Sequence, residues 1–175
     1  MSRSNTLLLL VFMLASNIVM SQGHKVHITT VTASIEELNA GYLRWMDLHP
    51  NHFQVGKPLM LSMPRIDLYS PSGTLLYSGE DSEQNAKFIN NSLAKFLTIK
   101  HEPTTIFRPT LKEALNLLPK LTAQRTENLP PDTYILFAVT YPDTSMCKAQ
   151  NDVISQLVRR VLPFKLRIIQ LALSQ

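Results

Sequence analysis

The stretch that decides the fold is TYILFAVTYPDTSMCKAQ, residues 133–150. Its first part, TYILFAVTY, is an almost unbroken run of apolar and β-branched residues, which is typical of a strand buried on both faces of a sheet. A Pro-Asp pair interrupts that run, and a helical pattern follows from about Thr144 to Val161. Residues 133–150 therefore predict a buried strand that turns directly into a helix, with Cys147 in the first turn of that helix.

The segments on either side of this stretch extend the pattern. A second strand, predicted over Lys165 to Leu173, completes a β-α-β unit, whose right-handed crossing places the two strands in parallel. Near the other end of the chain, Lys25 to Ala33 predicts a strand rich in β-branched residues, and Ser34 caps a helix that ends at His49. Strands and helices thus alternate, which predicts an α/β protein.

The middle of the chain predicts a hairpin and two further helices. Residues 59–69 and 74–78 read as two strands around the turn Ser-Pro-Ser-Gly, and residues 82–96 read as a helix. Residues 100–131 predict a connector with one helix inside it. That helix begins at the capping box T-L-K-E and closes at Pro119.

Two motifs in these segments resemble motifs of a known superfamily. The first is Thr144-Ser145-Met146-Cys147-Lys148, at the corner between the buried strand and its helix. It is similar to the T-x-x-C motif of peroxiredoxins and, with threonine in place of the first cysteine, to the C-x-x-C motif of thioredoxins. The second is Met63-Pro64, followed by a hairpin and a helix, which is similar to the cis-proline motif of secreted thioredoxin-like proteins.

The resemblance implies a thioredoxin-like fold, a three-layer α/β sandwich with a central mixed sheet, which residues 24–175 would form as one domain. In the family, however, the cysteine corner comes first and the cis-proline hairpin comes later. Here residues 24–99 supply the later half, residues 100–131 the connector and residues 132–175 the earlier half. We favour a circular permutation as the explanation. The alternatives are two halves that complete one another in a homodimer, and a coincidence of short patterns.

Cys147 decides which chemistry the resemblance allows. A helix N-terminus favours the thiolate, and the resemblance implies Cys147 as a nucleophile, Thr144 as its hydrogen-bonding neighbour and Arg65 as a nearby cation. It also implies that Met63 and Pro64 bind an extended substrate. Because the chain has one cysteine, an internal dithiol cycle cannot close. The alternative interpretation of Cys147 is an inert, half-buried helix residue.

Three functions are therefore compatible with the sequence. We expect first an accessory module without a dithiol, which binds a protein or peptide partner beside Pro64. The alternatives are a thiol-dependent oxidoreductase that uses Cys147 alone, and a structural component of an envelope assembly that docks through its basic C-terminal face or its hairpin edge. We expect no cofactor and no metal site, because the chain has only five glycines for a phosphate loop and residues 49–52 offer two histidines without a third ligand.

The N-terminus predicts export from the cytoplasm. Residues 1–22 combine Arg3, an apolar stretch from Leu7 to Leu14 and a polar end, the layout of a cleaved signal peptide, and so predict a secreted or periplasmic protein. No later stretch is long and apolar enough to span a membrane.

The charge balance, 17 basic against 13 acidic residues, does not predict a nucleic-acid partner. One basic cluster near the C-terminus fits either a solvated helix end with the outward face of a strand, or a surface for an anionic partner. Its members are Arg159, Arg160, Lys165 and Arg167.

Overall fold

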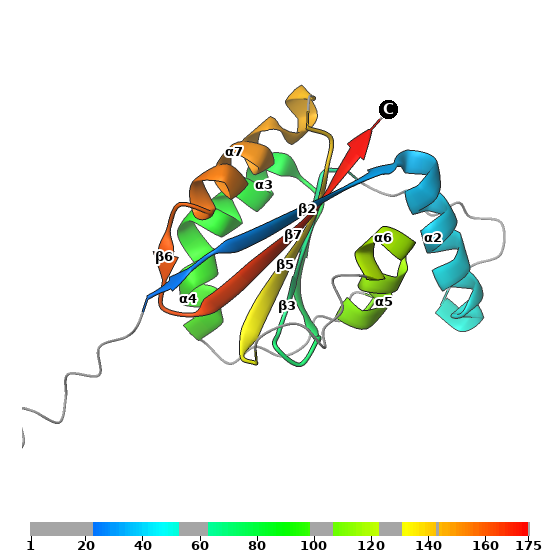
Figure 1. Cartoon of the computed structure of the whole chain (residues 1–175), viewed down its shortest axis with the longest axis horizontal. Helices are drawn as coiled ribbons and strands as arrows, with labels where there is room; N and C mark the ends of the chain where they lie inside the picture. The colour runs from blue at the N-terminus through cyan, green and yellow to red at the C-terminus, as the bar shows by residue number, and fades with distance from the viewer. Residues whose placement is uncertain (1–22, 53–62, 99–106, 123–130, 143, 175) are drawn as a thin grey trace, which may run out of the picture.

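A mixed sheet of five strands forms the middle layer of the protein (Figure 1). The structure is a computed structural model that describes residues 23–52, 63–98, 107–122, 131–142 and 144–174. Strands β2, β7 and β5 are parallel, whereas β3 is antiparallel to both β5 and β4. In spatial order the strands are β2 (His27–Ser34), β7 (Lys165–Ser174), β5 (Thr133–Thr140), β3 (Arg65–Tyr69) and β4 (Leu75–Gly79). A separate antiparallel pair is formed by β1 (His24–Lys25) and β6 (Val161–Leu162).

Helices cover both faces of this sheet, so the protein is a mixed α/β sandwich (Figure 1). One face carries α3 (Ser82–Lys87), the π-helical turn η2 (Phe88–Ser92), α4 (Leu93–Thr98) and α7 (Lys148–Leu157). The other face carries α2 (Ile35–Asp47), α5 (Leu111–Asn116) and α6 (Pro119–Thr122). Two short 3-10 turns complete the described elements, η1 (Pro50–His52) and η4 (Ser145–Cys147).

Strand β5 is buried on both faces, as its apolar run predicts. Successive side chains of a strand point to opposite faces, so Ile135 and Phe137 join the core under α2, α5 and α6, while Leu136 and Ala138 join the core under α3, α4 and α7. All four of these side chains are fully buried. The strand therefore belongs to both cores at once and holds the two helix layers together.

Most predicted elements are present, with boundaries that shift by a few residues. The parallel pairing of β5 with β7 is confirmed, and so are the hairpin, the N-cap at Ser34 and the capping box of Thr110 with Glu113. Ser34 also forms a capping box with Glu37, which was not predicted from the sequence. The strand predicted over residues 59–69 corresponds to β3, which begins at Arg65. Residues 59–62 of the prediction lie outside the described part of the chain.

Two features differ from the prediction. Pro119 does not end the connector's secondary structure but starts α6, because proline lacks the N–H that the first position of a helix leaves unused. The short pair of β1 with β6 was not predicted, since two-residue strands leave no periodic pattern in a sequence.

Gly41 lets α2 approach the end of α5 closely. A Cβ atom at this position would collide with the carbonyl oxygen of Leu117, which also accepts a hydrogen bond from Arg44 Nη2 at 3.1 Å. Gly41→Ala should therefore lower the free energy of unfolding by about 1–3 kcal/mol, although alanine is normally the better helix former by about 1 kcal/mol.

Urea unfolding of the full chain measures this change in stability. Asn39→Ala, at an exposed position of the same helix, is the matched control and should stabilise the protein by about 0.5 kcal/mol. A stabilising Gly41→Ala would contradict the close approach of α2 to Leu117.

Candidate functional site

The predicted binding residues and the start of α7 line one hollow of about 490 Å³. Met63 and Pro64 form one wall, and the Met63-Pro64 peptide bond is cis, as the resemblance implies. Met146, Lys148 and Ala149, from η4 and the first turn of α7, form the wall opposite. The remaining wall is the segment that leads into α3.

Sheet topology explains why these distant segments meet. Strand β3 runs antiparallel to β5, and Arg65 is paired with Val139. The start of β3 therefore lies beside the end of β5, where the chain enters η4 and α7. Residues 63–64 and residues 145–149 are brought together by this one pairing.

A buried polar network fixes α3 against α7 below the hollow. The Gln150 N–H donates to Ser82 Oγ at 2.9 Å, and Asn85 Nδ2 donates to Gln150 Oε1 at 2.6 Å. Gln150 Nε2 donates in turn to the carbonyl oxygen of Val139 at 3.3 Å. Asn85 and Gln150 are fully buried, so these bonds satisfy polar groups that water cannot reach. The network holds the hollow's two helical walls in a defined geometry.

Cys147 lies at the start of α7, where the sequence places it, but it does not line the hollow. The residue is fully buried, and its Sγ accepts a hydrogen bond from the Tyr141 N–H at 3.3 Å. The adjacent Met146 is 63% exposed and lines the hollow instead. An incoming oxidant or thiol therefore reaches Cys147 only if this corner opens.

Arg65 points away from α7, to the sheet face that α2 covers. Its Nε lies 3.1 Å from Asp67 Oδ2, it donates to the Tyr42 hydroxyl, and its guanidinium carbon lies 5.1 Å from the centre of the Tyr42 ring. Asp67 Oδ1 also accepts a hydrogen bond from Ser78 at 2.7 Å. Arg65 and Asp67 are almost completely buried, so each charge neutralises the other inside the protein.

Thr144 contacts Cys147 through the backbone, since the Cys147 N–H donates to the Thr144 carbonyl oxygen at 3.2 Å, but its side chain lies elsewhere. Its hydroxyl is buried without a hydrogen-bond partner among the described residues, and the residue lines a different hollow of about 400 Å³, beside Tyr141 and Pro142. The structure thus brings Met63 and Pro64 together at one site. It places Cys147 in the interior, Thr144 in a neighbouring hollow and Arg65 on the opposite face of the sheet.

The hollow beside Pro64 has an acidic rim. Its lining includes four carboxylates and one ammonium group, that of Lys148. A hydrogen bond to Asp152 at 2.6 Å, together with the charge of that carboxylate, raises the pKa of Lys148. The four carboxylates belong to Glu80, Asp81, Glu83 and Asp152.

The acidic turn before α3 is explained in part by local interactions. Capping is present, because Asp81 accepts a hydrogen bond from the Gln84 N–H at 2.8 Å, and Glu80 pairs with Arg108. The shared location with Asp152 depends on the packing of α3 against α7, which no local pattern indicates.

No metal centre is evident in the part of the chain that the structure describes: nowhere there do three or more His, Cys, Asp or Glu residues come together so that they could hold an ion. Among the described helices, none has the length and apolar character needed to cross a membrane. Comparison of the chain with protein-family models, with curated proteins and with solved structures gave no match.

Replacement of Arg65 tests the buried ion pair. Arg65→Met should lower the free energy of unfolding by about 3–5 kcal/mol, because it leaves the Asp67 carboxylate buried without its cation. In the double variant Arg65→Met/Asp67→Asn the isolated charge is gone, and at least half of the lost stability should return. Urea unfolding measures both changes. Equal losses in the single and double variants would contradict the role of Arg65 as the partner of Asp67.

The accessibility of Cys147 can be measured directly. In the folded full chain, its reaction with an aromatic disulfide reagent should be about a hundredfold slower than in urea-unfolded protein, because the buried thiol reacts only through local opening. Met146→Cys/Cys147→Ala, which moves the thiol one residue to an exposed position, is the matched control and should react rapidly. Equal rates for the two folded proteins would show that Cys147 is accessible.

Proposed function

We propose that this chain is an exported accessory protein with a circularly permuted thioredoxin-like fold, which binds an extended segment of a partner protein at the acidic hollow beside Met63 and Pro64. Residues 1–22, on which the export proposal depends, lie outside the described part of the chain. The binding proposal is carried by one observation, the shared hollow that these two residues form with the first turn of α7.

The strand pairings support a permutation within one chain. Strand β2 from the first half pairs with β7 from the last, and β3 from the first half pairs with β5 from the last. The sheet is therefore continuous within a single molecule, and a second copy is not required to complete it. This favours a permutation over two halves that complete one another in a homodimer.

The position of β3 restricts how a partner segment can bind. Both edges of β3 are already paired, with β5 and β4, so a segment cannot extend the sheet alongside it. Met63, which lies before the strand begins, is partly exposed and lines the hollow. We therefore propose that the segment crosses the hollow between Met63 and Met146 rather than running along β3.

The chemistry of the walls indicates the kind of segment. Met63, Pro64 and Met146 offer an apolar surface, and methionine side chains adapt to different shapes. Of the four rim carboxylates, Glu80 is paired with Arg108 and Asp152 with Lys148, so a net negative charge remains and attracts positive charge. The expected ligand is an extended segment in which apolar side chains alternate with Lys or Arg. The alternative of a thiol-dependent enzyme would require Cys147 to become exposed.

A labelled peptide tests this proposal. We expect an unstructured ten-residue peptide of alternating Lys, Leu and Thr to bind the full chain in fluorescence anisotropy, and the same peptide with Glu in place of Lys not to bind. Ala149→Gln, which fills the hollow from a helical position, should weaken binding by about fivefold or more.

Two matched controls separate the site from general effects. Ala94→Gln makes the same change at an exposed position of α4 and should leave binding unchanged. Glu83→Gln should weaken binding, whereas Glu36→Gln, also in the first turn of a helix, should not. Equal affinities for the Lys and Glu peptides, or equal effects of the two alanine substitutions, would exclude the hollow as the binding site.

A further inference from the structure

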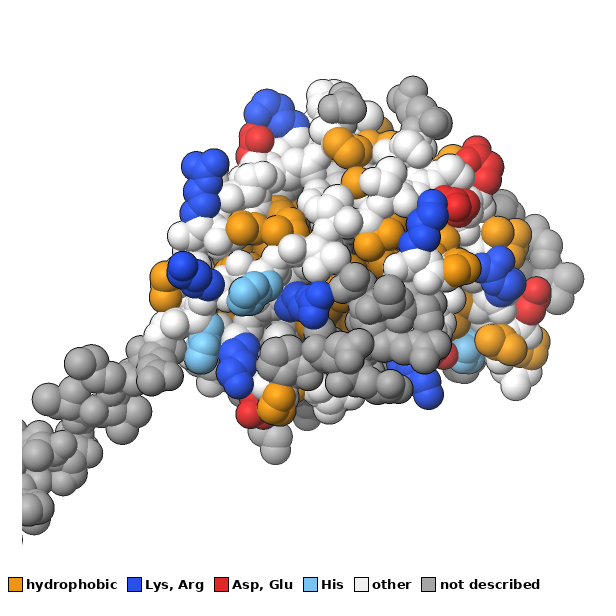
Figure 2. All heavy atoms as spheres, viewed as in Figure 1, with side chains coloured by type: hydrophobic (Ala, Val, Ile, Leu, Met, Phe, Trp, Pro, Cys, Tyr) orange, Lys and Arg blue, Asp and Glu red, His pale blue; other side chains and the backbone are white. Residues whose placement is uncertain are grey.

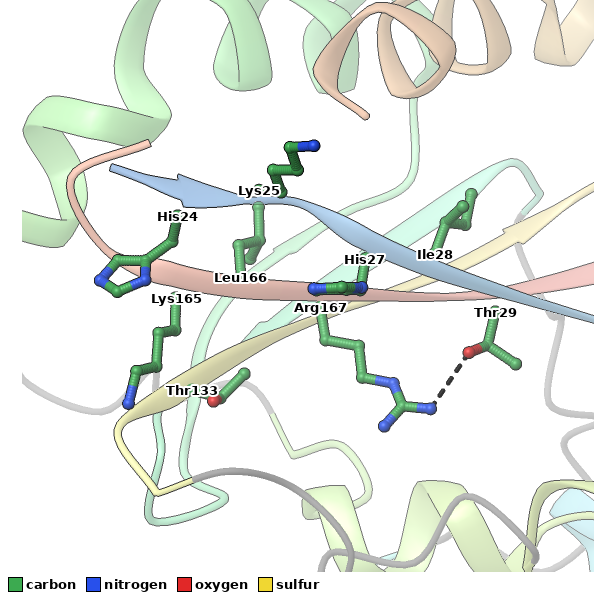
Figure 3. A pocket seen from close by; sticks show the side chains of 9 residues that line it. All are labelled: His24, Lys25, His27, Ile28, Thr29, Thr133, Lys165, Leu166 and Arg167. Carbon is green, nitrogen blue, oxygen red and sulfur yellow. Dashed lines mark hydrogen bonds between the residues drawn. The ribbon is translucent and has the colours of Figure 1, made fainter. Parts of the chain in front are cut away.

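A second hollow, of about 530 Å³, opens at the opposite end of the sheet, where β2, β7 and β5 begin (Figure 3). This volume is in the range of sites for small molecules. None of the nine described residues that line it is acidic, and five of them are Lys, Arg or His. In the space-filling view, Lys, Arg and His side chains gather over this end of the molecule (Figure 2). The five are His24, Lys25, His27, Lys165 and Arg167.

The register of the sheet concentrates these side chains. His27 and Arg167 are direct partners in β2 and β7, and Lys165 lies two residues before Arg167 and is paired with Thr133. Side chains two residues apart in a strand share a face. The close-up shows Lys165 and Arg167 extending to the same side, whereas Lys25 extends to the other (Figure 3). The ammonium group of Lys165, the guanidinium group of Arg167 and the imidazole of His27 therefore line the same hollow.

Hydrogen bonds hold the two cationic side chains at the wall of the hollow. Lys165 Nζ donates to the carbonyl oxygen of Pro131 at 3.3 Å, and Arg167 Nη2 donates to Thr29 Oγ1 at 3.1 Å. Both residues are only partly exposed. Two cationic groups at one wall favour the binding of an anion.

Thr133 supplies an independent indication of a ligand. The residue is 7% exposed, and its hydroxyl has no hydrogen-bond partner among the described residues. A buried hydroxyl without a partner is unfavourable, and it is unusual in a folded protein. Because Thr133 lines the hollow next to Lys165, an oxygen atom of a ligand bound there can accept this hydrogen bond.

We propose that this hollow binds a small molecule through a phosphate or sulfate group, with Lys165, Arg167 and Thr133 as the donors. A tetrahedral oxyanion offers several acceptor oxygens, which suits an ammonium group, a guanidinium group and a hydroxyl that line one hollow from two adjacent strands. The cations line a hollow of small-molecule size, which favours a compact ligand over a nucleic-acid backbone. The site is separate from the acidic hollow, and its test does not depend on the proposed peptide binding.

Isothermal titration calorimetry of the full chain with inorganic pyrophosphate and, separately, with sodium sulfate at constant ionic strength tests the proposal. We expect one site per chain for at least one of these probes, and the tighter probe identifies the preferred group. Lys165→Gln and Arg167→Gln should each weaken its binding by about tenfold or more. Lys95→Gln removes the same charge from an exposed position on α4 and should change the affinity by less than about twofold.

Thr133→Val separates binding from folding. Valine has nearly the shape of threonine and removes the buried hydroxyl, so the melting temperature should stay the same or rise while anion affinity falls by about threefold or more. The absence of binding by both probes, an unchanged affinity in both Lys165→Gln and Thr133→Val, or an equal loss in Lys95→Gln would overturn the proposal.

Discussion

The burial of β5 on both of its faces and along both of its edges is the constraint on which the rest of the structure depends. Its neighbours are β7, from the same half of the sequence, and β3, from the other half. Its side chains belong alternately to the two hydrophobic cores, and the covering helices pack their apolar side chains into these same cores. Apolar burial is the main favourable term in folding, and it is non-directional. In β5, however, burial specifies the pairing of the strand, because only one register places every apolar side chain in a core.

The hollows at the two ends of the sheet both follow from this arrangement. Where β5 ends, the chain turns into η4 and α7 beside the start of β3, and the carboxylates of α3 and α7 make that end acidic. Where β5 begins, it lies beside the start of β7, and that end is lined by cationic side chains. One sheet thus separates two hollows whose linings differ in charge, which is the basis of the two different ligands proposed above.

Local patterns in the sequence predicted much of the fold, because the features concerned are themselves local. The apolar run of β5, the helix caps at Ser34 and Thr110, and the place of Cys147 at the start of a helix each depend on a few neighbouring residues. The sandwich of helices around a mixed sheet was also predicted in outline. The thioredoxin-like identity remains an interpretation of motifs and strand order.

The sites were harder to predict, because they depend on the face of the sheet to which a side chain points and on the strands that lie beside it. Arg65 directly follows Pro64 in the sequence, yet strand alternation directs it to the other side of the sheet, toward Asp67 and Tyr42. Lys165 and Arg167 were assigned either to an outward strand face or to a surface for an anionic partner. Their partly enclosed position depends on the register with β2 and β5, which joins residues far apart in the chain.

The burial of the single thiol has a consequence for the chemistry of this protein in an oxidising compartment. In an oxidising compartment, a lone accessible cysteine forms mixed disulfides with any available thiol, including the same cysteine of another copy. Folding prevents this reaction, because it buries Cys147 and places its sulfur atom against the backbone N–H of Tyr141. Covalent dimers linked through Cys147 would therefore form from chains that were oxidised before they had folded.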